Sequence, residues 1–191
     1  MAEYRFLTVW WTTAVTDRVW EALADYATWP TWWRGIRSVE VLRRGDESGV
    51  GTLLRQQWRS RVPYTLVFDL EMLRIEGGKL LEGRASGDLE GSCRWTLAPV
   101  DGGTELRFAV DVRTGRWWMN LPIPLAQRVV RSSFGTVMHW GREGLARTLG
   151  VPVELRSTDG GGAGRLSGWQ PALRSSHRTL CSKQHLSISS R

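Results

Sequence analysis

The sequence is poor in the residues that build disulfide frameworks, metal sites and membrane spans. Its 191 residues include two cysteines, Cys93 and Cys181, and three histidines, His139, His177 and His185. No His, Cys or carboxylate cluster has the spacing of a metal site, and two distant cysteines imply no disulfide framework. There is no run of about 18 apolar residues, as a membrane span requires. The amino terminus lacks the basic-then-apolar pattern of a signal peptide. We therefore expect a soluble, cytoplasmic protein without a metal.

Phosphate-binding and nucleophile motifs are also missing. The chain has no dinucleotide fingerprint, no phosphate-binding glycine loop and no G-x-S-x-G elbow. The glycine cluster at residues 160–164 neither follows a predicted strand nor opens a helix, so it is typical of a linker. We expect no cofactor.

The net charge of +7 is unevenly distributed along the chain. Residues 151–191 hold six Lys or Arg and two Asp or Glu, a balance of +4. Residues 1–150 hold 20 basic and 17 acidic side chains, a balance of only +3. A nearly balanced domain without a basic stripe argues against a nucleic-acid partner.

The sequence is, by contrast, rich in tryptophan. It has twelve tryptophan residues, and seven of them lie before residue 59. Tryptophan is costly to expose, and its indole N–H needs a partner when it is buried. The cluster predicts the walls of a roomy, mostly apolar cavity for a flat or greasy small molecule. A tryptophan-rich core without a cavity is the alternative. The seven early residues are Trp10, Trp11, Trp20, Trp29, Trp32, Trp33 and Trp58.

The order of predicted elements is a strand, two short helices, six strands and one long helix. Residues 4–13 are rich in β-branched and aromatic types, as is typical of a strand. The first short helix is expected to begin at Thr16, and residues 25–33 form the second. Apolar and polar residues alternate in the strands, which is typical of an antiparallel sheet with one packed face. Apolar residues then recur at helical spacing over 124–149. The six later strands are expected at 37–44, 50–60, 64–75, 79–88, 92–98 and 104–113.

This order predicts an α+β fold in which a curved, seven-stranded antiparallel sheet wraps round the long C-terminal helix. The space between sheet and helix is the expected cavity. Residues 1–152 form the predicted ligand-binding domain. Residues 153–191 form a basic tail rich in Gly, Ser and Arg, which we expect to be disordered because it has too little apolar surface to bury.

Several motifs resemble the START-like, helix-grip superfamily, also called SRPBCC. They are residues 14–25 (AVTDRVWEALAD), 29–33 (WPTWW), 51–52 (GT), 87–91 (GDLEG) and 141–145 (GREGL). Over residues 4–150 the chain looks most like the bacterial polyketide cyclase/dehydrase and lipid-transport branch. The resemblance implies a helix-grip fold around a ligand cavity. Its members include cyclases, lipid carriers, hormone receptors and co-chaperone-like proteins, so the fold alone does not define an activity.

Strand phase and the tryptophan cluster nominate residues that face the cavity. Small residues leave room for a ligand, which favours the phase of strand 79–88 that turns Leu81, Gly83, Ala85 and Gly87 inward; the opposite phase buries Glu82 with Arg84. The predicted cavity residues are Trp10, Thr12, Trp32, Trp33, Gln56, Trp58, Tyr64, Phe68, Ala85, Trp95, Phe108, Val110, Trp117, Phe134 and Met138.

Two functions fit such a cavity. The first is a carrier or sensor that binds an apolar or aromatic, polyketide-like or lipid molecule. The alternative is a polyketide cyclase, aromatase or dehydratase, with Tyr64 or Arg84 as an acid or charge-stabilising group. A packed tyrosine and a surface arginine are the other interpretation of these two residues. Trp117 and Trp118 lie on a segment expected to cover the cavity. The alternatives are that they pack on the opening helices or contact a membrane surface peripherally.

Overall fold

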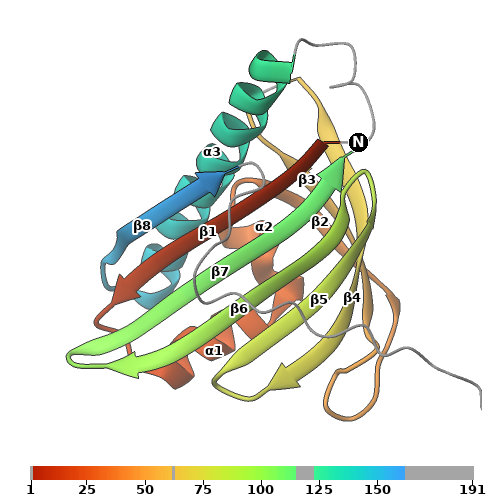
Figure 1. The fold of residues 1–191 in the computed structure, drawn as a ribbon. Coiled ribbons are helices and arrows are strands. Elements are labelled where there is room, and N and C mark those ends of the chain that lie inside the picture. The colour runs from red at the N-terminus through yellow and green to blue at the C-terminus, as the bar shows by residue number, and fades with distance from the viewer. Residues whose placement is uncertain (1, 62, 115–122, 162–191) are drawn as a thin grey trace, which may run out of the picture.

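The computed structural model describes residues 2–61, 63–114 and 123–161. The elements follow the predicted order, with one strand added at the end (Figure 1). They are β1 (Ala2–Thr12), α1 (Thr16–Ala24), the 3-10 turn η1 (Tyr26–Thr28), α2 (Trp29–Trp32), β2 (Ile36–Arg43), β3 (Leu53–Arg59), β4 (Thr65–Glu76), β5 (Leu80–Gly87), β6 (Glu90–Val100), β7 (Gly103–Thr114), α3 (Ile123–Leu149) and β8 (Val153–Gly161).

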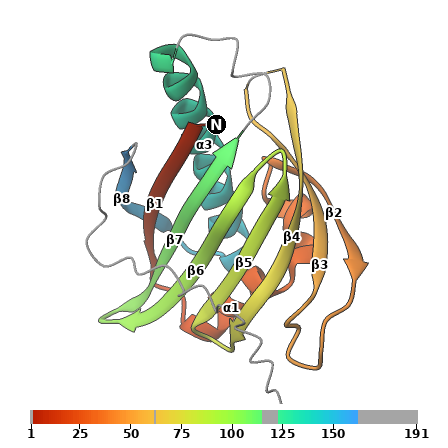
Figure 2. The ribbon, with the colours of Figure 1, turned by 45° about the vertical axis from the view of Figure 1, so that its right-hand side comes forward.

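Within these residues the strands form a single sheet in the order β2-β3-β4-β5-β6-β7-β1-β8. Every neighbouring pair is antiparallel. Figures 1 and 2 show the sheet strongly curved, with the three helices on its concave side. Because side chains alternate between the two faces of a strand, Phe68 of β4 and Phe108 of β7 point to this concave side. Val67 and Leu73 of β4 are exposed on the opposite face. The predicted α+β helix-grip fold is confirmed.

The eighth strand occupies the beginning of the predicted tail. β8 pairs along β1 from Thr12↔Val153 to Arg5↔Gly161. Gly150, with φ of 73°, ends α3 in the left-handed region and turns the chain back toward the sheet. The Thr12 hydroxyl then donates to the Pro152 carbonyl oxygen at 2.8 Å. The expected boundary at residue 153 was therefore wrong, and the rest of the predicted tail, residues 162–191, lies outside the described residues.

Two glycines of α3 allow the helix to approach the tryptophans of α2. A Cβ atom on Gly144 would overlap the Trp32 carbonyl oxygen, and one on Gly141 would overlap the Trp33 indole. The Trp33 indole N–H donates to the Val137 carbonyl oxygen at 2.7 Å. Both tryptophans are buried, and Trp33 is completely so. In the core, α3 thus packs closely against α2, and both helices pack against the concave face of the sheet.

Candidate functional site

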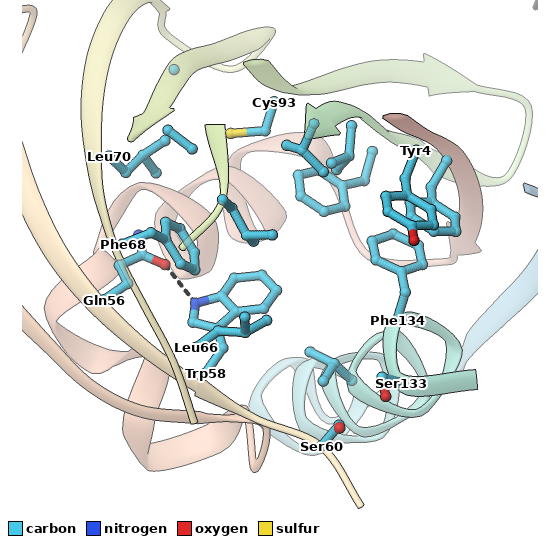
Figure 3. A pocket seen from close by; sticks show the side chains of 18 of the residues that line it. Tyr4, Gln56, Trp58, Ser60, Leu66, Phe68, Leu70, Cys93, Ser133 and Phe134 are labelled. Atoms are coloured by element: carbon cyan, nitrogen blue, oxygen red, sulfur yellow. Dashed lines mark hydrogen bonds between the residues drawn. The ribbon is translucent and has the colours of Figure 1, made fainter. Parts of the chain in front are cut away.

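A hollow of about 130 Å³ remains between the concave face of the sheet and α3. Its described lining is almost wholly aliphatic and aromatic, and Arg59 is the one charged residue among the described side chains that line it. Figure 3 shows Gln56 and Phe68 on one side of the hollow, Tyr4 and Phe134 on the other, and Ser60 and Ser133 together at a third edge.

Ten of the predicted cavity residues line this hollow. Eight of them come from five strands and α3, Trp33 directly follows α2, and Tyr64 directly precedes β4. The curvature of the sheet brings them around one space. They are Trp33, Gln56, Trp58, Tyr64, Phe68, Ala85, Trp95, Phe108, Val110 and Phe134.

Four other predicted cavity residues are buried but lie in the solid part of the core: Trp10, Thr12, Trp32 and Met138. The Trp10 ring packs between Trp33 and Trp95, at centroid distances of 6.2 and 5.4 Å. Trp10 and Thr12 belong to the end of the sheet near α1, where the Thr16 and Thr104 hydroxyls lie 3.0 Å apart. None of the four is among the residues that line the hollow. Trp117 and Trp118 lie outside the described residues.

One wall of the hollow is a stack of nearly parallel rings, which we call the aromatic stack (Tyr4, Phe6, Phe134, Phe108 and Trp95). The interplanar angles of successive rings are 1°, 12°, 11° and 19°. The Phe6–Phe134 and Trp95–Phe108 pairs are closest, with centroids 4.1 and 4.3 Å apart. Four strand residues and one α3 residue share this orientation, so the stack joins helix to sheet.

The opposite wall contains a buried amide. Gln56 has no exposed surface, and its Oε1 accepts a hydrogen bond from the Trp58 indole N–H at 2.7 Å. Its Nε2 is buried and has no hydrogen-bond partner within residues 2–61, 63–114 and 123–161. A buried donor without a partner is rare in a folded protein. Gln56 is therefore the polar group expected inside the cavity, and its donor is unsatisfied.

Two hydroxyl groups across the hollow from Gln56 are also buried and unsatisfied. Tyr4 lies on β1 and Thr114 at the end of β7, and both hydroxyls are buried without a hydrogen-bond partner in the described part of the chain. Burial raises the pKa of Tyr4 above its ordinary value of 10.0, so the phenol keeps its proton at neutral pH. Both residues were missed as site residues. The alternation of the first strand, which groups Tyr4 with Phe6, was a signal that could have found the first of them.

The two candidate catalytic residues have different surroundings. The Tyr64 side chain lines the hollow, and its hydroxyl donates to the Asp88 carboxylate at 2.8 Å. Asp88 also accepts from the Val67 backbone N–H at 2.9 Å. Arg84 is exposed on the convex face, between inward-facing Gly83 and Ala85. The period of two along β5 places Arg84 away from the hollow, which contradicts its candidate role as an acid or charge-stabilising group for a ligand held there.

The phase of β5 follows from the same alternation. Leu81, Gly83 and Ala85 line the hollow, whereas Gly87 is exposed where the strand ends. Glu82 faces the other way and accepts from Arg94 Nη2 at 3.0 Å. Small inward side chains on this strand are what keeps the hollow open.

Cys93, on β6, is another lining residue that the sequence interpretation missed. Burial is the main cause that raises the pKa of its thiol from 9.0 to about 12, and the Glu82 carboxylate adds to this effect. At neutral pH the thiol is protonated, so it behaves as an apolar wall group rather than as a nucleophile.

Within the described ranges, no group of three His, Cys, Asp or Glu residues is placed to hold a metal ion. In the same part of the chain no helix is long and apolar enough to cross a membrane.

The fold and the hollow define a START-like, helix-grip protein. The chain belongs to the polyketide cyclase/dehydrase and lipid transport family, whose model matches residues 13–150. No curated protein is similar enough in sequence to match the chain.

Solved structures share the architecture at low sequence identity. The Zhui aromatase/cyclase from a Streptomyces species is 16% identical, with a TM-score of 0.64 over 76% of this chain and 93% of that one. A START superfamily protein from Mycobacterium smegmatis is 14% identical, with a TM-score of 0.59 over 72% and 93%. The two-domain aromatase/cyclase StfQ of the steffimycin biosynthetic pathway is 11% identical, with a TM-score of 0.62 over 78% of this chain and 52% of that protein. At these identities the likeness concerns the fold.

Proposed function

We propose that this protein binds an apolar or aromatic small molecule, polyketide-like or lipid, in the hollow, and that it acts as a carrier or sensor. The observation that carries the proposal is the hollow itself, which has an apolar lining and a wall of parallel rings. A dry engineered cavity of about 150 Å³ binds benzene. A hollow of about 130 Å³ therefore has room for an aromatic ring.

Native mass spectrometry of the full-length protein tests this proposal directly, because a bound apolar compound adds its mass to the folded chain. A titration with ethylbenzene, followed by tryptophan fluorescence and calorimetry, is the second measurement. Trp33, Trp58 and Trp95 all line the hollow, so an occupant changes their emission. The proposal fails if no compound co-purifies and ethylbenzene does not bind.

A matched pair of variants locates the binding. Ala85 faces the hollow and Ser86, its neighbour on β5, faces solvent. Ala85→Leu fills empty space, so we expect ethylbenzene affinity to fall at least about tenfold while the fold is retained. Ser86→Leu adds the same bulk outside and leaves that affinity unchanged. Equal binding by both variants places the ethylbenzene site elsewhere.

A cyclase, aromatase or dehydratase is the second candidate. Tyr64, which contacts both the hollow and the Asp88 carboxylate, is the observation that favours it. Such chemistry runs largely by holding a flexible chain in a shaped cavity near one acid or base. Against it stands the lack of Asp, Glu, His or Lys among the described lining residues. A linear poly-β-ketone that loses water during incubation with the protein, but not with Ala85→Leu, favours the enzyme over the carrier.

A further inference from the structure

Gln56 combines complete burial with an incomplete set of hydrogen bonds. Its Oε1 accepts from the Trp58 indole N–H, and its Nε2 has no hydrogen-bond partner among the residues that the structure describes. An indole N–H can only donate, so the amide oxygen must be the atom that faces Trp58. This bond fixes the orientation of the amide, and the two N–H groups of Nε2 point to its other side.

The surroundings of the amide are apolar. Gln56 lies on β3 directly opposite Phe68 of β4, and both side chains line the hollow. Figure 3 shows the Phe68 ring beside the amide. Phe68 and Trp58 are in edge contact, with centroids 5.6 Å apart. An oriented donor is thus held behind an aromatic ring at one side of a space large enough for a ligand.

We propose that Gln56 Nε2 donates a hydrogen bond to a ketone oxygen of the bound ligand, so that the hollow prefers an aryl ketone to a hydrocarbon of the same shape. This inference rests on the proposed binding function. Because Gln56 has no exposed surface, the Phe68 ring must turn aside for the oxygen to reach Nε2, which then gains its missing partner. The aromatic stack then holds the apolar body of the ligand.

The test compares two probes that differ at one position. Acetophenone carries a carbonyl group where ethylbenzene has a methylene. Calorimetry gives the dissociation constants of both for the full-length protein and for Gln56→Met, which keeps the length of the side chain but has no donor. A neutral hydrogen bond corresponds to about a tenfold change in affinity. We expect the ratio of ethylbenzene to acetophenone dissociation constants to fall about tenfold in Gln56→Met.

Gln57→Met is the matched control, because Gln57 is the next residue on β3 and its amide is exposed outside the hollow. We expect this variant to keep the native preference for acetophenone. If Gln56 serves only to satisfy the Trp58 indole, Gln56→Met changes the two affinities in parallel, and the proposal is overturned.

A spectroscopic measurement tests the same bond without any variant. A hydrogen bond to the carbonyl lowers the C=O stretching frequency of bound acetophenone below its value in an alkane solvent. An unshifted frequency overturns the assignment to Gln56, whereas ethylbenzene binding still supports the hollow as a ligand site. Failure of both probes to bind removes the ligand site and this inference together.

Discussion

At the scale of single residues, burial keeps the side chains of Cys93 and Tyr4, which line the hollow, uncharged at neutral pH. Cys93 shows this most clearly, since its pKa is raised from 9.0 to about 12. Below pH 9 the thiol is protonated in both the folded and the unfolded chain, and its full contribution to stability is present. Above that pH the unfolded chain loses the proton first, so the free energy of unfolding falls as pH rises toward 12. The slope reaches about 1.4 kcal/mol per pH unit.

The measurement is a series of urea denaturation curves between about pH 8 and pH 11 for the protein and for Cys93→Ala. We expect the variant to have a lower free energy of unfolding at pH 8 and a shallower fall above pH 9. Tyr4, whose pKa is also raised, titrates in both proteins and cancels in the comparison. Parallel curves for the two proteins contradict a native thiol that resists ionisation.

At the scale of elements, α3 is placed by residues that have no side chain. Gly144 lies against the Trp32 carbonyl oxygen, whereas Gly135, on the exposed side of the same helix, has open space around its α-carbon. Gly144→Ala must push helix and backbone apart and is expected to destabilise the protein by about 1–3 kcal/mol. Gly135→Ala should stabilise it by about 0.5–1 kcal/mol, because alanine is the better helix former. Thermal unfolding measures the two stability changes, which we expect to have opposite signs. A similar loss of stability in both variants contradicts the close contact between Gly144 and the Trp32 carbonyl oxygen.

The same scale explains how far the sequence predicts this fold and its site. Alternation in the strands identifies the inward faces, and it correctly groups Phe68 and Phe108 with the concave side. Alternation does not say where along a strand the covering helices lie. Trp10 and Phe6 therefore share a face of β1, yet Trp10 packs in the solid core and Phe6 lines the hollow. The position of a residue along a curved strand depends on α1 and α3, which are distant in sequence.

At the scale of the whole molecule, the sheet is completed by a segment with weak local signals. Residues 153–161 begin shortly after Gly150 and end in two glycines, so composition alone groups them with the tail. Their strand conformation depends on long-range partners: β1 supplies the hydrogen-bonding edge, and the Trp11 ring lies 4.8 Å from the Arg156 guanidinium. Val153 is buried at the start of the strand. Tertiary pairing here overrides local composition.

Two truncations test where the folded unit ends. A chain ending at residue 161 keeps β8, so we expect its melting temperature to equal that of the full chain. A chain ending at residue 152 loses the β8 ladder and the buried Val153, and it leaves the edge of β1 open to pairing with other chains. Its melting temperature should fall by about 2–4 °C for each kcal/mol lost, with aggregation at high concentration. Differential scanning calorimetry and light scattering distinguish the two. If all three chains have the same melting temperature, β8 adds no stability and the folded domain ends before it. If the melting temperature already falls in the chain ending at residue 161, the stabilising contacts belong to residues beyond β8.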